Sequence, residues 1–82
     1  MTSFLVETYA PSAIALADAE ARARLAAVEL ARSGTPVHYI RSIFVPGDEM
    51  CLYLFEAPSA EAVREASERA GLSPGRIVEA VE

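Results

Sequence analysis

Nine of the 19 residues from Ala13 to Ala31 are alanine, and this segment is a helix in almost any fold open to the chain. Alanine is the strongest helix former. Gly34 and, two residues later, Pro36 are typical of the end of a helix. The sequence therefore predicts one long helix over residues 13–33, and the remaining segments must pack around it.

A second helix is predicted from Ser59, as its N-cap, to Gly71. Pro58 and Ser59 are typical of a helix start, and Glu61 is favoured in the first turn by the helix dipole. Four further segments are rich in β-branched and aromatic residues and predict strands, with a turn at Pro46-Gly47-Asp48 between the second and the third: Ser3–Tyr9, Val37–Val45, Glu49–Phe55 and Arg76–Val81.

The predicted order is strand, helix, strand, strand, helix, strand. This order is typical of the split βαβ or ferredoxin-like fold of the α+β class, a four-stranded antiparallel sheet with two helices on one face. A chain of 82 residues is long enough for one such unit, so we expect a single domain over residues 1–82.

The charge balance argues against several classes of partner. The chain has 12 acidic residues against 7 basic ones, a net charge of −5, and all its basic residues are arginines without a basic run. Binding to nucleic acid or to an anionic membrane needs clustered cations, so neither is expected. The longest uncharged stretch is too short to span a bilayer, and the first residues lack the pattern of a signal peptide. We expect a cytoplasmic protein.

Alternation along the strands predicts which side chains lie on the sheet face away from the helices. Glu7, Arg41 and Glu79 mark that open face as the charged side. On the third strand, the aliphatic Met50, Leu52 and Leu54 are expected to point toward the helices. The open face then carries a large apolar set, which predicts a homodimer through it: Leu5, Tyr9, Val37, Tyr39, Ile43, Val45, Tyr53, Phe55, Ile77 and Val81.

Two apolar stripes are expected on the first helix. One, which runs from Leu16 to Leu30 through several alanines, should cover the sheet. The other is more apolar than a solvated helix face and supports association with a partner: Ile14, Ala21, Leu25 and Val28.

A homodimer would enclose a few polar groups between its two sheets. Glu7 and Arg41 are candidates for a small-molecule cavity there, with Tyr9, Tyr39 and Tyr53 as hydroxyl donors. An interface ion pair and ordinary aromatic core are the structural alternatives for these residues. Small ferredoxin-like dimers include cyclases, isomerases and cofactor-free oxygenases, but that is an analogy of fold.

Three residues are candidates for binding a divalent metal. His38 is the only histidine, and neutral imidazole suits nickel and zinc. Glu56, at the end of the third strand, is a candidate carboxylate ligand, and Cys51 is a candidate thiolate ligand. Each also has a structural interpretation: a structural histidine, a cap at a helix start, and a small buried hydrophobic residue.

Several stretches resemble a family of small bacterial proteins of unknown function that includes a nickel-binding protein. They are FLVE near the start, YIRSIFVP, FEAPSAEAVREA and ERAGLSPGRIVE, and the resemblance covers nearly the whole chain. It implies a ferredoxin-like fold, a dimer and metal binding, with His38 matching the family's VHYI histidine and Cys51 lying near a cysteine position on strand three. The nickel-binding relatives carry a further histidine where this chain has Ser67.

Three functions therefore stay open. The first is a cytoplasmic homodimeric protein that binds nickel or another divalent metal through His38 and carboxylates such as Glu7 or Glu56. The second is small-molecule binding, or a cyclase-, isomerase- or oxygenase-like reaction, in a cavity on the open face. The third is a structural accessory protein without a ligand.

Overall fold

The computed structural model describes residues 1–9 and 16–81 of the chain. Its regular elements follow the predicted order, with a single 3-10 turn at Pro46–Asp48 between the second and third strands. They are β1 (Thr2–Tyr9), α1 (Leu16–Arg32), β2 (His38–Val45), β3 (Met50–Ala57), α2 (Ala60–Arg69) and β4 (Pro74–Ala80).

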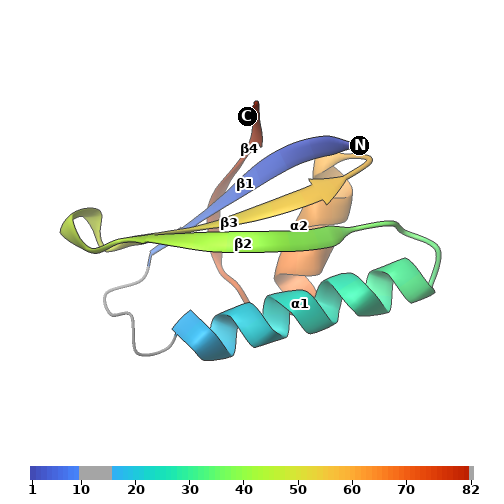
Figure 1. The fold of residues 1–82 in the computed structure, drawn as a ribbon, viewed down its shortest axis with the longest axis horizontal. Coiled ribbons are helices and arrows are strands. Elements are labelled where there is room, and N and C mark those ends of the chain that lie inside the picture. The colour runs from blue at the N-terminus through green and yellow to red at the C-terminus, as the bar shows by residue number, and fades with distance from the viewer. Residues whose placement is uncertain (10–15, 82) are drawn as a thin grey trace.

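The four strands form one antiparallel sheet in the order β2-β3-β1-β4. Figure 1 shows both helices on one side of this sheet and no helix on the other. The prediction of an α+β ferredoxin-like fold is confirmed. In the described part of the chain, no helix is long and apolar enough to span a membrane.

Each helix covers the sheet with the face that its sequence pattern predicts. The inward stripe of α1 is buried, and small side chains bring the helix close to the sheet. α2 buries Val63 and Ala66 and exposes its charged face, and its C-cap residue Ala70 is also buried. At its start, the Ser59 hydroxyl accepts a hydrogen bond from the Ala62 amide at 3.3 Å. On the outer stripe of α1, Leu25 and Val28 are exposed, while Ile14 lies outside the described residues.

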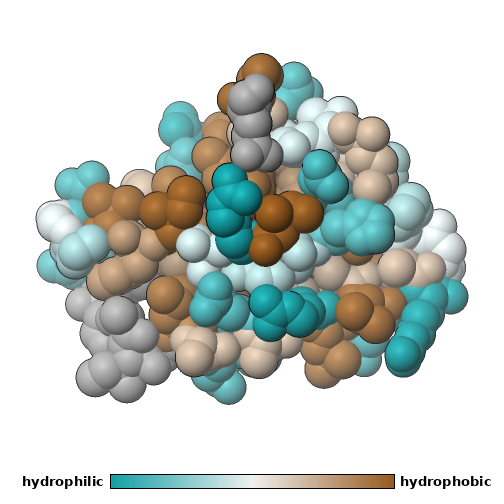
Figure 2. All heavy atoms as spheres, viewed as in Figure 1, coloured by the Kyte–Doolittle hydropathy of each residue, from teal (hydrophilic) through white to brown (hydrophobic). Residues whose placement is uncertain are grey.

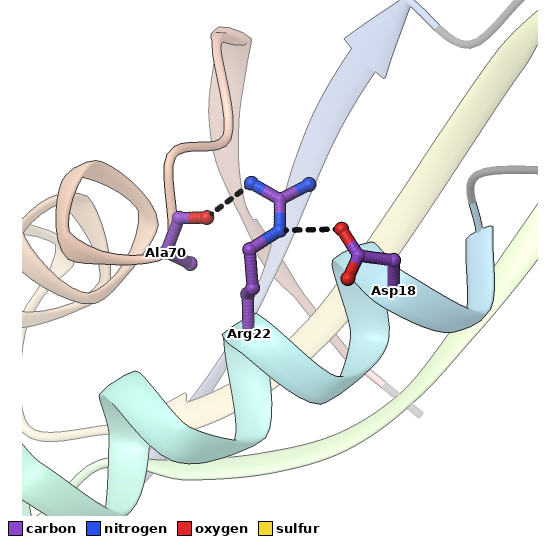
Figure 3. Close-up of polar contacts among 3 residues, drawn as sticks. All are labelled: Asp18, Arg22 and Ala70. Carbon is purple, nitrogen blue, oxygen red and sulfur yellow. Dashed lines mark hydrogen bonds and ion pairs between the residues drawn. The ribbon is translucent and has the colours of Figure 1, made fainter.

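A side-chain clamp joins the two helices at the end of α2. Arg22 of α1 donates a hydrogen bond from Nη1 to the carbonyl oxygen of Ala70 at 2.7 Å, and its Nε pairs with Asp18 at 3.1 Å (Figure 3). The last carbonyls of a helix have no partner within the helix, so the guanidinium caps α2 from outside. Gly71, at φ +73°, then turns the chain toward β4.

The prediction for β3 was wrong: its aliphatic side chains lie on the open face. Cys51, Tyr53 and Phe55 point toward the helices and are buried. α1 presents alanines to the sheet, so large rings from the sheet are needed to fill the layer between them. The T-shaped contact between Phe55 and Tyr39, with ring centroids 5.5 Å apart, fills part of that layer.

A β-bulge in β2 reverses the alternation that we expected for its first residues. The pairing with β3 shifts between Tyr39 and Arg41, which leaves Ile40 as the extra residue. Ahead of the bulge, Val37 and Tyr39 point toward the helices, against our prediction. After the bulge the prediction holds, and the open face carries Arg41, Ile43 and Val45. Each of them is the direct cross-strand partner of an open-face residue of β3.

On β4 the two faces are also exchanged relative to the prediction. Ile77 pairs with Val6 and Glu79 pairs with Phe4, so both lie on the helix side, while Val78 pairs with Leu5 on the open side. Glu79 is exposed nonetheless, because β4 is an edge strand and its side chains reach solvent from either face. The assumption that a charged residue marks the open face therefore gave the wrong orientation for this strand.

The open face that results is still largely apolar. Figure 2 shows apolar (brown) patches interrupted by polar (teal) ones over the sheet above α1. The apolar residues that the register places on this face are Leu5, Ile43, Val45, Met50, Leu52, Leu54, Val78 and Ala80.

Candidate functional site

One corner of the open face brings together two of the three metal-ligand candidates. His38 opens β2 and is the direct cross-strand partner of Glu56 on β3, beside Ser3 of β1. Directly opposed residues of antiparallel strands have Cβ atoms about 4.5–5.5 Å apart, close enough for both side chains to reach one ion. His38 is exposed and Glu56 is half-buried.

Cys51 does not belong to this corner. It lies five residues before Glu56 on β3, on the helix side, where its side chain is fully buried. Burial raises the pKa of the Cys51 thiol and so disfavours the thiolate that would bind a metal. In residues 1–9 and 16–81, no group of three or more His, Cys, Asp or Glu side chains is placed to hold a metal ion.

The cavity candidates Glu7 and Tyr9 lie at the opposite end of the open face. Glu7 pairs with Arg76 of β4, with Nη2 to Oε2 at 2.9 Å, and the Tyr9 hydroxyl donates to Glu49 at 2.7 Å. The hydrogen bond and the negative charge of Glu49 raise the pKa of Tyr9. Arg41 lies across β3 from β1, beside Leu54. The cation beside Glu7 is thus Arg76 and not Arg41.

Tyr39 and Tyr53 point away from this face, into the layer between sheet and helices. Tyr53 is buried, and burial raises the pKa of its hydroxyl. Burial likewise raises the pKa of Tyr39, which is half-buried. The five cavity candidates therefore do not surround one space on the open face.

A polar cluster on the helix side escaped the sequence analysis. Glu20 of α1 accepts hydrogen bonds from the Tyr39 hydroxyl, at 2.9 Å, and from the Ser42 hydroxyl. Arg24 lies over the Tyr39 ring, with Cζ 5.2 Å from the ring centroid. The hydroxyls of Ser42 and Tyr39 lower the pKa of Glu20. The sequence offered one signal, the spacing of Glu20 and Arg24 by one turn of the predicted helix. The β2 bulge that turns Tyr39 inward left no mark in the sequence.

This cluster predicts a pH-dependent contribution to stability. The pKa of Glu20 is lowered from its ordinary value of 4.5, so its contribution is present above pH 4.5 and is lost as the pH falls through the folded-state pKa. Glu20→Gln should lower the free energy of unfolding at pH 7 by less than about 1 kcal/mol, since the group is partly solvated. The difference from wild type should shrink below pH 4.5.

Urea unfolding at several pH values checks this prediction. The control is Glu29→Gln, an exposed position on the same helix, which should follow the wild type throughout. A Glu20→Gln deficit that stays constant from pH 7 to pH 3 would contradict the assignment to the carboxylate charge.

The comparisons with known proteins concern the whole fold. Residues 4–80 match the model of a family described as nickel responsive protein SCO4226-like. The chain is also similar to the crystal structure of SCO4226 from Streptomyces coelicolor A3(2), with a TM-score of 0.70 and 28% identity, over 98% of this chain and 96% of that one. No curated protein matches the sequence. The matched region includes the corner that holds His38 and Glu56.

Proposed function

Because the chain belongs to the family of nickel-responsive SCO4226-like proteins, we propose that it is a nickel-binding homodimer whose ligands are His38 and Glu56 of each copy. The observation that carries this proposal is the cross-strand pairing of these two residues at one corner of the open face. An imidazole nitrogen and a carboxylate oxygen are donors that Ni²⁺ accepts in proteins.

The number of donors explains why two copies are needed. The described residues of one chain offer only a pair of donors at this corner, and they include no metal-binding group of three. Nickel with nitrogen and oxygen ligands takes a square-planar or tetragonal arrangement of at least four donors. Two imidazoles and two carboxylates, one pair from each copy, supply four.

The character of the open face supports the homodimer itself. Apolar side chains from all four strands lie on the face that no helix covers, and Ile43, on the edge strand β2, is 47% exposed. Exposed apolar surface of this kind marks interaction sites on small proteins. Packing this face against a second copy removes it from water and encloses the His38 corners.

Isothermal titration of the metal-free protein with NiCl2 tests the proposal. We expect one nickel ion per two chains, and affinity that falls at lower pH because protons compete with the metal for its ligands. His38→Ala and Glu56→Gln should each weaken binding at least about tenfold, since in the dimer the first removes two of the four donors and the second replaces two carboxylates with neutral amides. Glu61→Gln, an exposed carboxylate on α2, is the control and should bind as the wild type does.

A further variant tests the need for a dimer while leaving the proposed metal ligands in place. Ile43→Asp places a charge on the open face at an exposed position of the edge strand β2. The chain should therefore fold but sediment as a monomer and bind nickel at least about tenfold more weakly. Nickel binding that survives in His38→Ala, or one nickel ion per monomeric chain, would overturn the proposal. A dimer that binds no nickel would favour an accessory protein instead.

A further inference from the structure

A shallow groove runs between α1 and β2 on the helix side of the edge strand. Figure 1 shows α1 lying below β2 along its length. The groove has two arginines, one histidine and otherwise uncharged lining: Arg24, Ala27, Val28, Ala31, Arg32, Val37, His38 and Tyr39.

Small side chains on α1 are the reason for this groove. Ala27 and Ala31 face the edge of the sheet with a single methyl each, so they leave space that a longer side chain would fill. Val28 and Val37 make the remaining wall apolar. The groove therefore offers a narrow apolar floor that suits a hydrocarbon chain or ring.

The charge of the groove is opposite to that of the chain. The protein has a net charge of −5 and 12 acidic residues, yet no carboxylate from the described residues lines this groove. The positive charge of Arg24 interacts with the Glu20 carboxylate, and its guanidinium lies over the Tyr39 ring. Arg32 has no hydrogen bond or ion pair with any residue in 1–9 or 16–81.

We propose that this groove binds an amphipathic carboxylate, a small molecule whose hydrocarbon body lies on Ala27, Ala31 and Val37 and whose carboxylate is held by Arg32. The guanidinium is matched to a carboxylate by charge and by its planar pair of N–H donors. The groove shares His38 with the proposed nickel site but is not lined by Glu56, and binding of the carboxylate needs no metal.

Titration of the metal-free, ¹⁵N-labelled protein with sodium octanoate tests the proposal by NMR. Saturable shifts are expected at the amides of Ala31, Val37 and Tyr39, with a Kd on the order of a few millimolar for a ligand of this size. Arg32→Gln should weaken binding at least about fivefold. 1-Octanol, which has the same chain without the charge, should bind more weakly than octanoate by a similar factor.

Two more variants make the result decisive. Arg64→Gln changes the net charge equally on the exposed face of α2 and should bind octanoate as the wild type does. Ala31→Leu, at an exposed position, should fill the groove and abolish the saturable shifts. Shifts confined to Leu52 and Val78 on the open face, equal binding of octanol, or binding unchanged in Arg32→Gln would each overturn the proposal.

Discussion

Replacing Phe55 with alanine should lower the free energy of unfolding by about 3–5 kcal/mol. Phe55 is fully buried on β3 and contacts Tyr39 edge to face. The facing helix contributes alanines, which cannot move into the space that the ring leaves. A chain of this length has a total stability of only about 4–12 kcal/mol, so the loss is a large fraction of the whole.

Chemical denaturation followed by circular dichroism checks this prediction. Leu25→Ala, at a position 57% exposed on the outer side of α1, is the matched control and should lie within about 0.5 kcal/mol of wild type. Phe55→Leu keeps part of the volume and should remain folded with a smaller loss. A cost near that of Leu25→Ala would contradict the inward placement of Phe55. It would favour the original prediction, in which Met50, Leu52 and Leu54 point toward the helices.

Gly71→Ala should lower the free energy of unfolding by about 2–3 kcal/mol, through two separable causes. Gly71 has φ +73°, a conformation that costs a residue with a Cβ about 1–2 kcal/mol. An added Cβ would also lie 2.8 Å from Nη1 of Arg22. The guanidinium must then move, and it loses the hydrogen bond that caps α2 at Ala70.

Two comparisons separate these causes. Gly34 also has positive φ, +103°, but nothing lies within 4 Å of an added Cβ, so Gly34→Ala reports the backbone cost alone. In an Arg22→Ala background, Gly71→Ala should cost no more than Gly34→Ala, because the clash and the clamp are both gone. Strictly additive losses for Arg22→Ala and Gly71→Ala would contradict the coupling of Gly71 to the hydrogen bond between Arg22 and Ala70, which Figure 3 shows.

Local chemistry determined the order of the elements in this protein. The alanine run, the Ser59 cap and the two glycines that follow the helices act within a few residues, so their effect is visible in the sequence. The inward stripes of both helices were visible for the same reason, since one buried face repeats every three to four residues. These signals sufficed to predict the ferredoxin-like fold.

Strand faces were a harder problem, and three of them were predicted incorrectly in whole or in part. A single extra residue in β2 exchanges the faces ahead of it, and no residue type marks that bulge. On β3 both alternating sets are apolar, so only the small side chains of α1 across the layer select the aromatic one. The choice depends on packing volume between distant segments, which alternation within one strand does not contain.

In the candidate site, too, the residue types were visible in the sequence but their contacts were not. His38 and Glu56 were singled out separately by residue type, whereas their opposition depends on the pairing of β2 with β3. Glu7 was expected beside Arg41, but the pairing of β1 with β4 gives it Arg76 instead, 69 residues away in the chain. The sequence by itself determined which elements form and which donor chemistries are present. The tertiary structure alone decided which donors meet, because strand register is set by long-range packing and hydrogen bonding across the whole sheet.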